Sequence, residues 1–234
     1  MGNEMMDLDQ LAVYLQRDVR EVSKLASRGY LPGHKVSGEW RFARAEINHW
    51  IETQLPGFTE QQLTALEAKG AADADQGPIV SALLPQACVA VPLAASTRAS
   101  VLKELVRLAE QSWQVYDPQA ILEAIRLREE MASTALETGV AVPHPRRPLP
   151  AALGESLVAY GRTASGVPFG EAHGHLTDIY FLVCCRDERT HLRVLARLSR
   201  LLLRPGFLAD LRSAETAAQT WHLIQAAEAD LGNG

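Results

Sequence analysis

The stretch from Arg128 to His144 concentrates the residue types that could do chemistry in this chain. His144 closes the stretch, directly after Pro143 and shortly after Gly139. A neutral imidazole is nucleophilic near pH 7, so a ring nitrogen of His144 could attack an electrophilic centre such as phosphorus. A single histidine is more often structural than chemical, so the surrounding residues must decide between these two interpretations.

The polar residues of this stretch have the spacing of a known motif, and a second motif, Thr190-His191-Leu192, follows His144 at a distance of 47 positions. A third run, Gly166-Val167-Pro168-Phe169, is similar to G-I-x-F. On these motifs, residues 79–231 resemble a IIA domain of the bacterial sugar phosphotransferase system. The class is type 2, which comprises fructose, mannitol and nitrogen-regulatory domains, and the spacing is typical of the nitrogen-regulatory branch. Nine positions match the pattern R-E-x-M-x-S-T-x-x-x-x-G-I-A-I-P-H, namely Arg128, Glu129, Met131, Ser133, Thr134, Gly139, Ala141, Pro143 and His144.

The resemblance implies that His144 accepts a phosphoryl group from a phosphohistidine carrier protein of the same system, without a cofactor. Arg128 would supply a planar, permanently charged fork for the phosphoryl oxygens. We expect His191 to lie one residue inside a helix capped by Thr190, where N–H groups and the helix dipole favour an anion. His191 would therefore bind the phosphoryl group rather than carry it.

Each site residue also has a plainer interpretation. Ser133 and Thr134, which the resemblance adds to the site, could be ordinary turn residues. Arg128 could satisfy carbonyl groups at a helix C-terminus, and His191 could be a polar residue at a helix start. Their joint register with His144 favours a common site over four separate structural roles.

Three departures from the family pattern bear on the donor and on the rate of transfer. Pro145 stands where glycine is common, and it removes a backbone N–H that could contact phosphate. His173 stands where an acidic residue is usual, and Cys184-Cys185 replaces a loop that usually contains proline. A metal site that combines His173 with the two site histidines and a cysteine is conceivable, but the spacing does not require it. We therefore predict no metal.

The elements that must position these residues follow an α/β pattern from about residue 78 onward. Helical periodicity alternates with short β-rich runs, which predicts an α/β fold with a IIA-type mixed β-sheet flanked by helices. Predicted helices cover 97–111, a segment starting at Pro118, a segment from Thr190 to before Pro205, 207–211 and 214–227. Predicted strands cover 140–142, 157–160 and 179–185.

Residues 7–52 form a separate pattern of short helices around a turn-rich middle. Gly29 is expected to end the second helix, and a small β-hairpin is predicted over 30–42. Both of the first two helices begin with capping-box spacing, Asp7 with Gln10 and Asp18 with Glu21. The pattern resembles a winged helix-turn-helix of the excisionase or MerR type, which places a helix in the major groove. The resemblance rests on Leu8, Leu11, Leu15, Arg17–Arg28, Gly29–Gly33, Lys35, Trp40–Phe42, Ile47 and Trp50.

This second resemblance implies double-stranded DNA as a partner. Basic and acidic residues cancel over 7–52, seven against seven, but 17–44 carries a net charge of +4. A basic face on a neutral module predicts modest affinity for one copy, which a homodimer would raise. A protein-docking module of the same fold is the alternative. The predicted DNA-contacting residues are Arg17, Arg20, Ser23 and Lys24 on the second helix, and Lys35, Arg41 and Arg44 toward phosphates.

The composition limits the class of protein and the compartment that we expect. The net charge is −5 and 47% of the residues are hydrophobic, which is ordinary for a globular protein and excludes a wholesale nucleic-acid coat. No apolar run is long enough to span a bilayer, and Met1–Asp7 lacks the apolar core of a signal peptide. Cys88, Cys184 and Cys185 form no C-x-x-C pair, so we expect a reducing cytoplasm and no membrane insertion.

These observations predict three regions. They are a helix-turn-helix DNA-binding module over 1–54, a linker with room for one short helix over 55–77, and a phosphoryl-accepting domain over 78–234. The predicted function is a cytoplasmic regulator in which phosphorylation of His144 is coupled to DNA binding, a phosphocarrier rather than a multiple-turnover enzyme. One alternative is a phosphocarrier that relays the group to another protein, with the N-terminal module used for docking. The other is an interaction protein with a site inactivated by Pro145.

Overall fold

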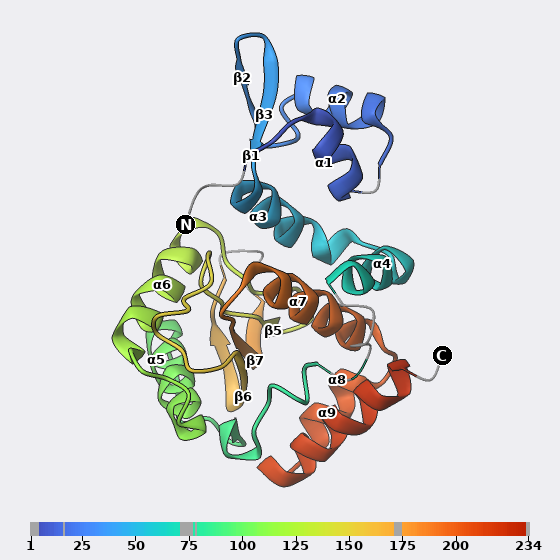
Figure 1. Cartoon of the computed structure of the whole chain (residues 1–234). Coiled ribbons are helices and arrows are strands. Elements are labelled where there is room, and N and C mark those ends of the chain that lie inside the picture. The colour runs from blue at the N-terminus through green and yellow to red at the C-terminus, as the bar shows by residue number, and fades with distance from the viewer. Residues whose placement is uncertain (1–4, 16, 71–76, 78, 171–174, 233–234) are drawn as a thin grey trace. The chain divides into compact units, whose positions relative to one another are not determined.

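The computed structural model describes residues 5–15, 17–70, 77, 79–170 and 175–232, and the chain forms two compact units (Figure 1). The first unit spans Met1–Gly57 and the second spans Phe58–Gly234. Among the described residues, no helix is both long enough and apolar enough to cross a bilayer.

The first unit is a small winged helical domain. Its β3 pairs antiparallel with both β1 and β2. Ser37 and Gly38 join β2 to β3, and their φ angles of 52° and 87° are those of a type I′ hairpin turn. Its elements are β1 (Met5–Met6), α1 (Leu8–Leu15), α2 (Val19–Ser27), β2 (His34–Val36), β3 (Glu39–Ala43), α3 (Arg44–Gln54) and the 3-10 turn η1 (Leu55–Gly57). Its fully buried side chains include Leu11, Val22, Phe42 and Ile47.

The helix ends of this unit follow the sequence signals with one exception. The capping box predicted at the start of α1 forms, and Gly29, with a φ of +74°, ends α2. At the start of α2 the predicted box between Asp18 and Glu21 does not form. Asp18 still caps the helix, but its carboxylate accepts from the N–H of Arg20 at 2.8 Å. The Glu21 carboxylate pairs with the guanidinium of Arg17 at 2.7 Å. This charge-assisted bond takes the place of the predicted bond from Glu21 back to the N–H of Asp18.

The second unit is built around a four-stranded mixed sheet of order β4-β6-β7-β5. The central strands β6 and β7 are antiparallel, and each outer strand is parallel to its neighbour. The mixed sheet with flanking helices confirms the predicted fold class. The elements are α4 (Glu60–Gly70), η2 (Gln86–Cys88), β4 (Val89–Ala90), α5 (Arg98–Ala109), η3 (Glu110–Ser112), α6 (Pro118–Met131), β5 (Val140–Ala141), β6 (Leu157–Pro168), β7 (Leu176–Cys184), α7 (Glu188–Leu203), α8 (Phe207–Ser213) and α9 (Ala217–Gly232).

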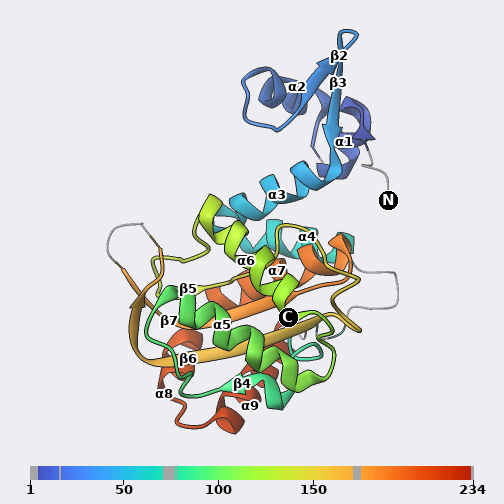
Figure 2. The same cartoon turned by 90° about the vertical axis from the view of Figure 1, so that its left-hand side faces the viewer.

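Helices cover both faces of this sheet, with α5 and α6 on one face and α7 and α9 on the other (Figures 1 and 2). Leu157, Ala159, Tyr180 and Leu182 belong to the core cluster under α5 and α6. The residues that alternate with these, Val158, Tyr160, Phe181 and Val183, point to the other face and are fully buried as well. Burial on both faces explains why β6 and β7 read as continuous apolar runs. Two of the predicted strands are too short at one end. Strand β6 continues beyond the predicted 157–160 to Pro168, and β7 begins at Leu176 rather than at 179, because the antiparallel ladder extends past the apolar runs.

Helix α4 belongs to the second unit and lies within 55–77, the range predicted to be a linker with room for one short helix. It packs against α7 through buried Leu63 and through Glu67, whose carboxylate pairs with Arg197 and lies 2.9 Å from Arg200. Arg197 also reaches Glu228 of α9 at 3.2 Å. One buried ion-pair network therefore joins α4, α7 and α9.

Candidate functional site

Strand β5 delivers His144 to the edge of the sheet where the parallel strands β5 and β7 both end. The pairing continues beyond β5, since the N–H of Val183 donates to the carbonyl of Pro143 at 3.0 Å. The turn before β5 depends on Gly139, whose φ is +82° and where an added Cβ would lie 2.8 Å from the guanidinium of Arg212. The sequence therefore folds locally so that His144 follows a fixed strand rather than a free loop.

The imidazole of His144 is oriented by its own backbone. Its Nδ1 lies 2.7 Å from the carbonyl oxygen of Val142. A carbonyl can only accept, so Nδ1 carries the proton and the neutral ring has its lone pair on Nε2. The geometry thus selects Nε2 as the nucleophilic atom.

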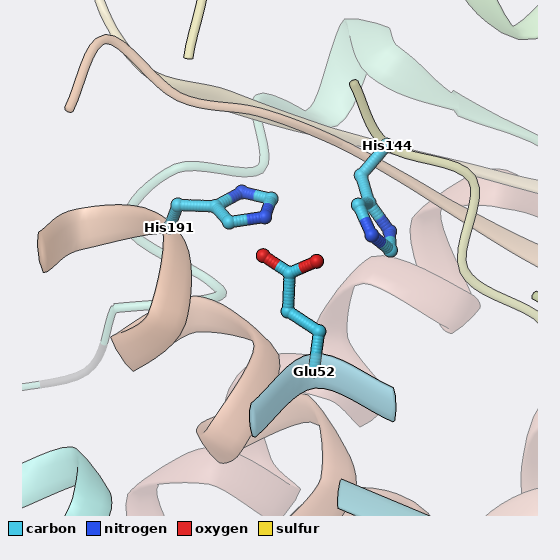
Figure 3. A group of neighbouring side chains, drawn as sticks. All are labelled: Glu52, His144 and His191. Carbon is cyan, nitrogen blue, oxygen red and sulfur yellow. The ribbon is translucent and has the colours of Figure 1, made fainter. Parts of the chain in front are cut away.

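His191 reaches the same edge from α7, which follows β7 directly. The centroids of the His144 and His191 rings are 5.2 Å apart and the rings are tilted by 59° (Figure 3). The structure therefore brings together two predicted site residues that are 47 positions apart in sequence. Glu52, which Figure 3 also draws, belongs to the first unit and lies 3.2 Å from Nδ1 of His49 there.

The predicted start of the His191 helix is wrong by a few residues. Asp187, not Thr190, is the N-cap, and its carboxylate accepts from the N–H of Thr190 at 2.8 Å and from its hydroxyl at 2.7 Å. A charged cap outcompetes a threonine hydroxyl for the N–H groups of the first turn. The N–H of His191 donates to the carbonyl of Asp187 at 3.1 Å, so its side chain, and not its backbone, is the group that could meet an anion.

Arg128 lies in the last turn of α6, and one of its terminal nitrogens donates to the carbonyl of Ala132 at 2.7 Å. This bond matches the plainer interpretation of an arginine that satisfies a helix C-terminus. A guanidinium carries five N–H donors, so it can bond to a helix carbonyl and contact other groups at the same time. Arg128 therefore combines a structural bond with a position at the start of the loop that leads to β5.

The hydroxyl groups of Ser133 and Thr134 serve this same loop. Thr134 donates its hydroxyl to the carboxylate of Glu129, and its N–H lies 3.1 and 3.3 Å from the two carboxylate oxygens. The hydroxyl oxygen of Ser133 accepts from the N–H of Ala135 at 3.2 Å. Since a threonine has only one O–H to donate, the hydroxyl of Thr134 holds the loop rather than a ligand in this structure.

The three cysteines add no nucleophile near neutral pH. Burial raises the pKa of Cys88 to about 11 and that of Cys184 to about 12, and burial raises the pKa of Cys185 as well. Such thiols stay protonated near neutral pH and are poor nucleophiles. His173 lies outside the residues that the structure describes.

The predicted DNA contacts differ in how they are engaged within the first unit. Arg20 and Lys24 are exposed on α2, and the described residues hold no acid paired with either. Arg17 pairs with Glu21, so part of its charge is offset.

The wing repeats this contrast. Lys35 is exposed in β2, with its ammonium 5.3 Å from the centroid of the Trp40 ring. Arg41 pairs with Glu39 at 2.7 Å, and the guanidinium of Arg44 lies 5.1 Å from the Tyr14 ring. Ser23 is half-buried on α2. Among the predicted contacts, the exposed cations therefore lie on α2 and on the hairpin, where a helix-turn-helix module with a wing would place them.

Two family models match the chain. The model described as "Phosphoenolpyruvate-dependent sugar phosphotransferase system, EIIA 2" matches residues 82–227. The model described as "Helix-turn-helix domain" matches residues 5–55. These matches confirm both family resemblances predicted from the sequence, and they fall in the two separate units.

Curated relatives match about three fifths of the chain. The chain is 29% identical over 139 residues to the fructose-specific EIIABC component of Bacillus subtilis, which covers 58% of this chain but only 21% of that protein. It is 27% identical over 150 residues to a nitrogen regulatory protein of Bradyrhizobium diazoefficiens, which covers 63% of this chain and 94% of that protein. The crystal structure of the nitrogen regulatory protein IIA-Ntr from Neisseria meningitidis has the same fold, with a TM-score of 0.56 and 21% identity over 62% of this chain and 98% of that one.

Proposed function

The chain belongs to the phosphoenolpyruvate-dependent sugar phosphotransferase system EIIA 2 family, and from this premise we propose that His144 accepts a phosphoryl group from a phosphohistidine carrier protein. The observation that carries the proposal is the bond from Nδ1 of His144 to the Val142 carbonyl, 2.7 Å long, beside the ring of His191. This bond leaves the lone pair on Nε2, which is the form of imidazole that can attack phosphorus.

The transfer needs no reagent besides the phosphohistidine donor, because one P–N bond forms as another breaks. The Nε2 lone pair attacks phosphorus and forms a P–N bond, while the P–N bond of the donor phosphohistidine breaks and its electron pair stays on the donor nitrogen. Nδ1 keeps its proton throughout, held by Val142. Catalysis then consists of in-line positioning and of cationic or N–H donors around the equatorial oxygens. Arg128 and the imidazole of His191 are the groups we assign to those oxygens.

The test is phosphorylation with phosphoenolpyruvate, the general phosphotransferase and its histidine carrier. We expect an acid-labile label on the wild type, none on His144→Ala, and a normal label on His222→Ala, which removes an exposed histidine of α9. An unlabelled wild type would overturn the proposal and favour an interaction protein with an inactive site, as the departure at Pro145 suggests. A label that survives His144→Ala would move the acceptor elsewhere.

For the first unit we propose binding of double-stranded DNA, regulated by the phosphorylation state of His144 and taking place in the cytoplasm. The helix-turn-helix match over 5–55 and the exposed cations Arg20, Lys24 and Lys35 support this role. A phosphoryl group adds nearly two negative charges, which can change how a neighbouring anion such as DNA is bound. The relay of the group to another protein, with docking by the first unit, is the competing proposal.

A DNA-shift series over several salt concentrations separates regulation from relay. Regulation predicts binding that weakens steeply with salt, is reduced by the double variant Arg20→Ala/Lys24→Ala, and differs between phosphorylated and unphosphorylated protein. The control variant Lys103→Ala, on α5 of the second unit, should bind normally. If no genomic fragment shows salt-sensitive binding, the DNA role fails and relay becomes the better account.

A further inference from the structure

Glu129 is a buried carboxylate that directly follows Arg128 of the proposed phosphoryl site, and the proposed reaction gives it no task although it is one of the nine motif positions. It is the residue after Arg128, near the end of α6, and only 2% of its surface is exposed. Its oxygens receive the N–H and the hydroxyl of Thr134. A buried charge is costly unless it is paired and hydrogen-bonded, so this arrangement has to be held together by specific partners.

The charge of Glu129 is paired by Arg98, the first residue of α5. One terminal nitrogen of Arg98 donates to the backbone carbonyl of Glu129 and lies 3.3 Å from its carboxylate. The guanidinium also lies 5.6 Å from the centroid of the Phe169 ring, and Phe169 packs at 5.3 Å against Tyr180 of the central strand β7. Arg98 thus ties the end of α6 to α5 and to the core of the sheet.

The loop from Ala132 to Gly139, which is hydrogen-bonded to Glu129 through Thr134, leads through β5 to His144. After Thr134, Ala135 forms a bridge with Ala141 of β5, and the N–H of Leu136 donates to the carbonyl of Val140 at 2.7 Å. Val142, which directly follows β5, supplies the carbonyl that orients the His144 ring. At its other end the same loop accepts the Arg128 guanidinium through the carbonyl of Ala132. A shift of Thr134 would therefore move both Arg128 and His144, the two groups that the proposed transfer has to keep in place.

We infer that Glu129, paired with Arg98, is a positioning residue for phosphoryl transfer: it clamps Thr134 so that Arg128 and the His144 ring keep their relative placement. The inference rests on the proposed phosphorylation of His144. Glu129 acts through Thr134 and does not touch the phosphoryl group, because a carboxylate in contact with it would repel it.

The first experiment compares Glu129→Gln with the matched control Glu130→Gln. Both remove one negative charge at neighbouring positions of α6, but Glu130 is exposed. Initial rates of transfer are measured against the concentration of phosphorylated carrier. Since a displacement of about 1 Å can cost roughly 100-fold in rate, we expect kcat to fall by about 10- to 100-fold in Glu129→Gln with KM little changed. Glu130→Gln should behave as the wild type.

A second measurement reads positioning without activity. The side-chain nitrogen shifts of His144 report which ring nitrogen carries the proton, and we expect them to change in Glu129→Gln while those of His222 stay constant. The pair Thr134→Val and Thr134→Ser tests the clamp from its other side. Valine loses the hydroxyl and should slow transfer, whereas serine keeps it and should restore the rate.

The outcomes separate the inference from its premise. A wild type that takes no label refutes the proposed phosphorylation itself. A labelled wild type, with Glu129→Gln at the wild-type kcat and unchanged His144 shifts, overturns the inference. If Glu129→Gln does not fold, the inference is tested with Thr134→Val and Arg98→Lys. If these variants fold and transfer at the wild-type rate, the inference is overturned.

Discussion

At the scale of single residues, the two histidines of the site are held in different ways. The ring of His144 is fixed through Nδ1 by Val142. His191 is anchored through its backbone, which is bonded to Asp187 inside the first turn of α7. The bond from Nδ1 sets the tautomer of the His144 ring and directs its lone pair to Nε2, as the acceptor role proposed for this residue requires. In the proposed division of roles, His144 is the acceptor and His191 is a binding group.

The difference can be measured with His191→Ala. We expect the label to remain on His144 but to form roughly 100-fold more slowly or worse, because one preorganised donor to the transferring group is lost. Peptide mapping of the labelled protein locates the phosphoryl group, and His222→Ala serves as the control for loss of a histidine. A label found on His191 in the wild type would reverse the two roles.

At the scale of elements, α4 is fastened to the second unit by charge rather than by apolar area. Leu63 is its one fully buried apolar side chain among the described residues of this helix, whereas Glu67 pairs with both Arg197 and Arg200. Burial by itself raises the pKa of Glu67, but hydrogen bonds and the charges of these two arginines outweigh burial and lower it. Helix α7, which carries His191, is thus braced along its length by an element that precedes the family match over 82–227.

This ion-pair network predicts a pH dependence of stability. Since the pKa of Glu67 in the folded protein lies below its ordinary value of 4.5, the network contributes fully above pH 4.5 and is lost as the pH falls through the lowered pKa. Glu67→Gln should destabilise α4 by about 1–3 kcal/mol, because Arg197 loses one of its two carboxylate partners and keeps only Glu228, and should flatten the acid slope. Hydrogen exchange of the α4 and α7 amides between pH 3 and 7, spanning the ordinary glutamate range, would measure both effects.

The matched control is Glu60→Gln on the same helix. Its side chain is 69% exposed and lies 4.0 Å from Arg200, at the limit of an ion pair. Exposed pairs contribute little, so this variant should exchange like the wild type. Equal exchange in the Glu67 and Glu60 variants would show that the buried network does not hold α4.

At the scale of the whole molecule, each unit has a core of its own. Phe42, Leu11 and Ile47 form that of the first unit, and the sheet with its two helical layers forms that of the second. Both site histidines and the clamp at Glu129 lie in the second unit, and the exposed cations of α2 and the wing lie in the first. Phosphoryl acceptance and DNA binding are therefore proposed for separately folded parts of one chain.

Separate folding predicts the behaviour of fragments. Residues 58–234 should fold alone and take the label at the rate of the full chain, because the site draws its proposed groups from this unit. A fragment that begins at residue 79 loses α4 and should unfold at a lower denaturant concentration, since Arg197 and Arg200 then lack Glu67. Circular dichroism and the labelling assay check both statements, and a 58–234 fragment that folds but stays unlabelled would contradict the first.

How much of this could be predicted from sequence depends on how local each signal is. The register from Arg128 to His144, the Thr190-His191-Leu192 motif and the helix-turn-helix pattern lie within short stretches, so the family and the fold class follow from them. The assignments of site residues and of the domain boundaries stay predictions. Local signals failed where a nearby charge competed, as at the start of α7, where Asp187 takes the cap expected of Thr190.

By itself, the sequence determined which residue types were available: a nucleophilic imidazole, an arginine in register with it, and a basic segment in a neutral module. Only the tertiary structure decided what each does. It brings the two site histidines together at one sheet edge, fixes the tautomer of His144 through Val142, and joins Arg98 to Glu129 across 31 positions. Hydrogen bonds need distance and direction, and neither exists until strands and helices from distant parts of the chain have packed.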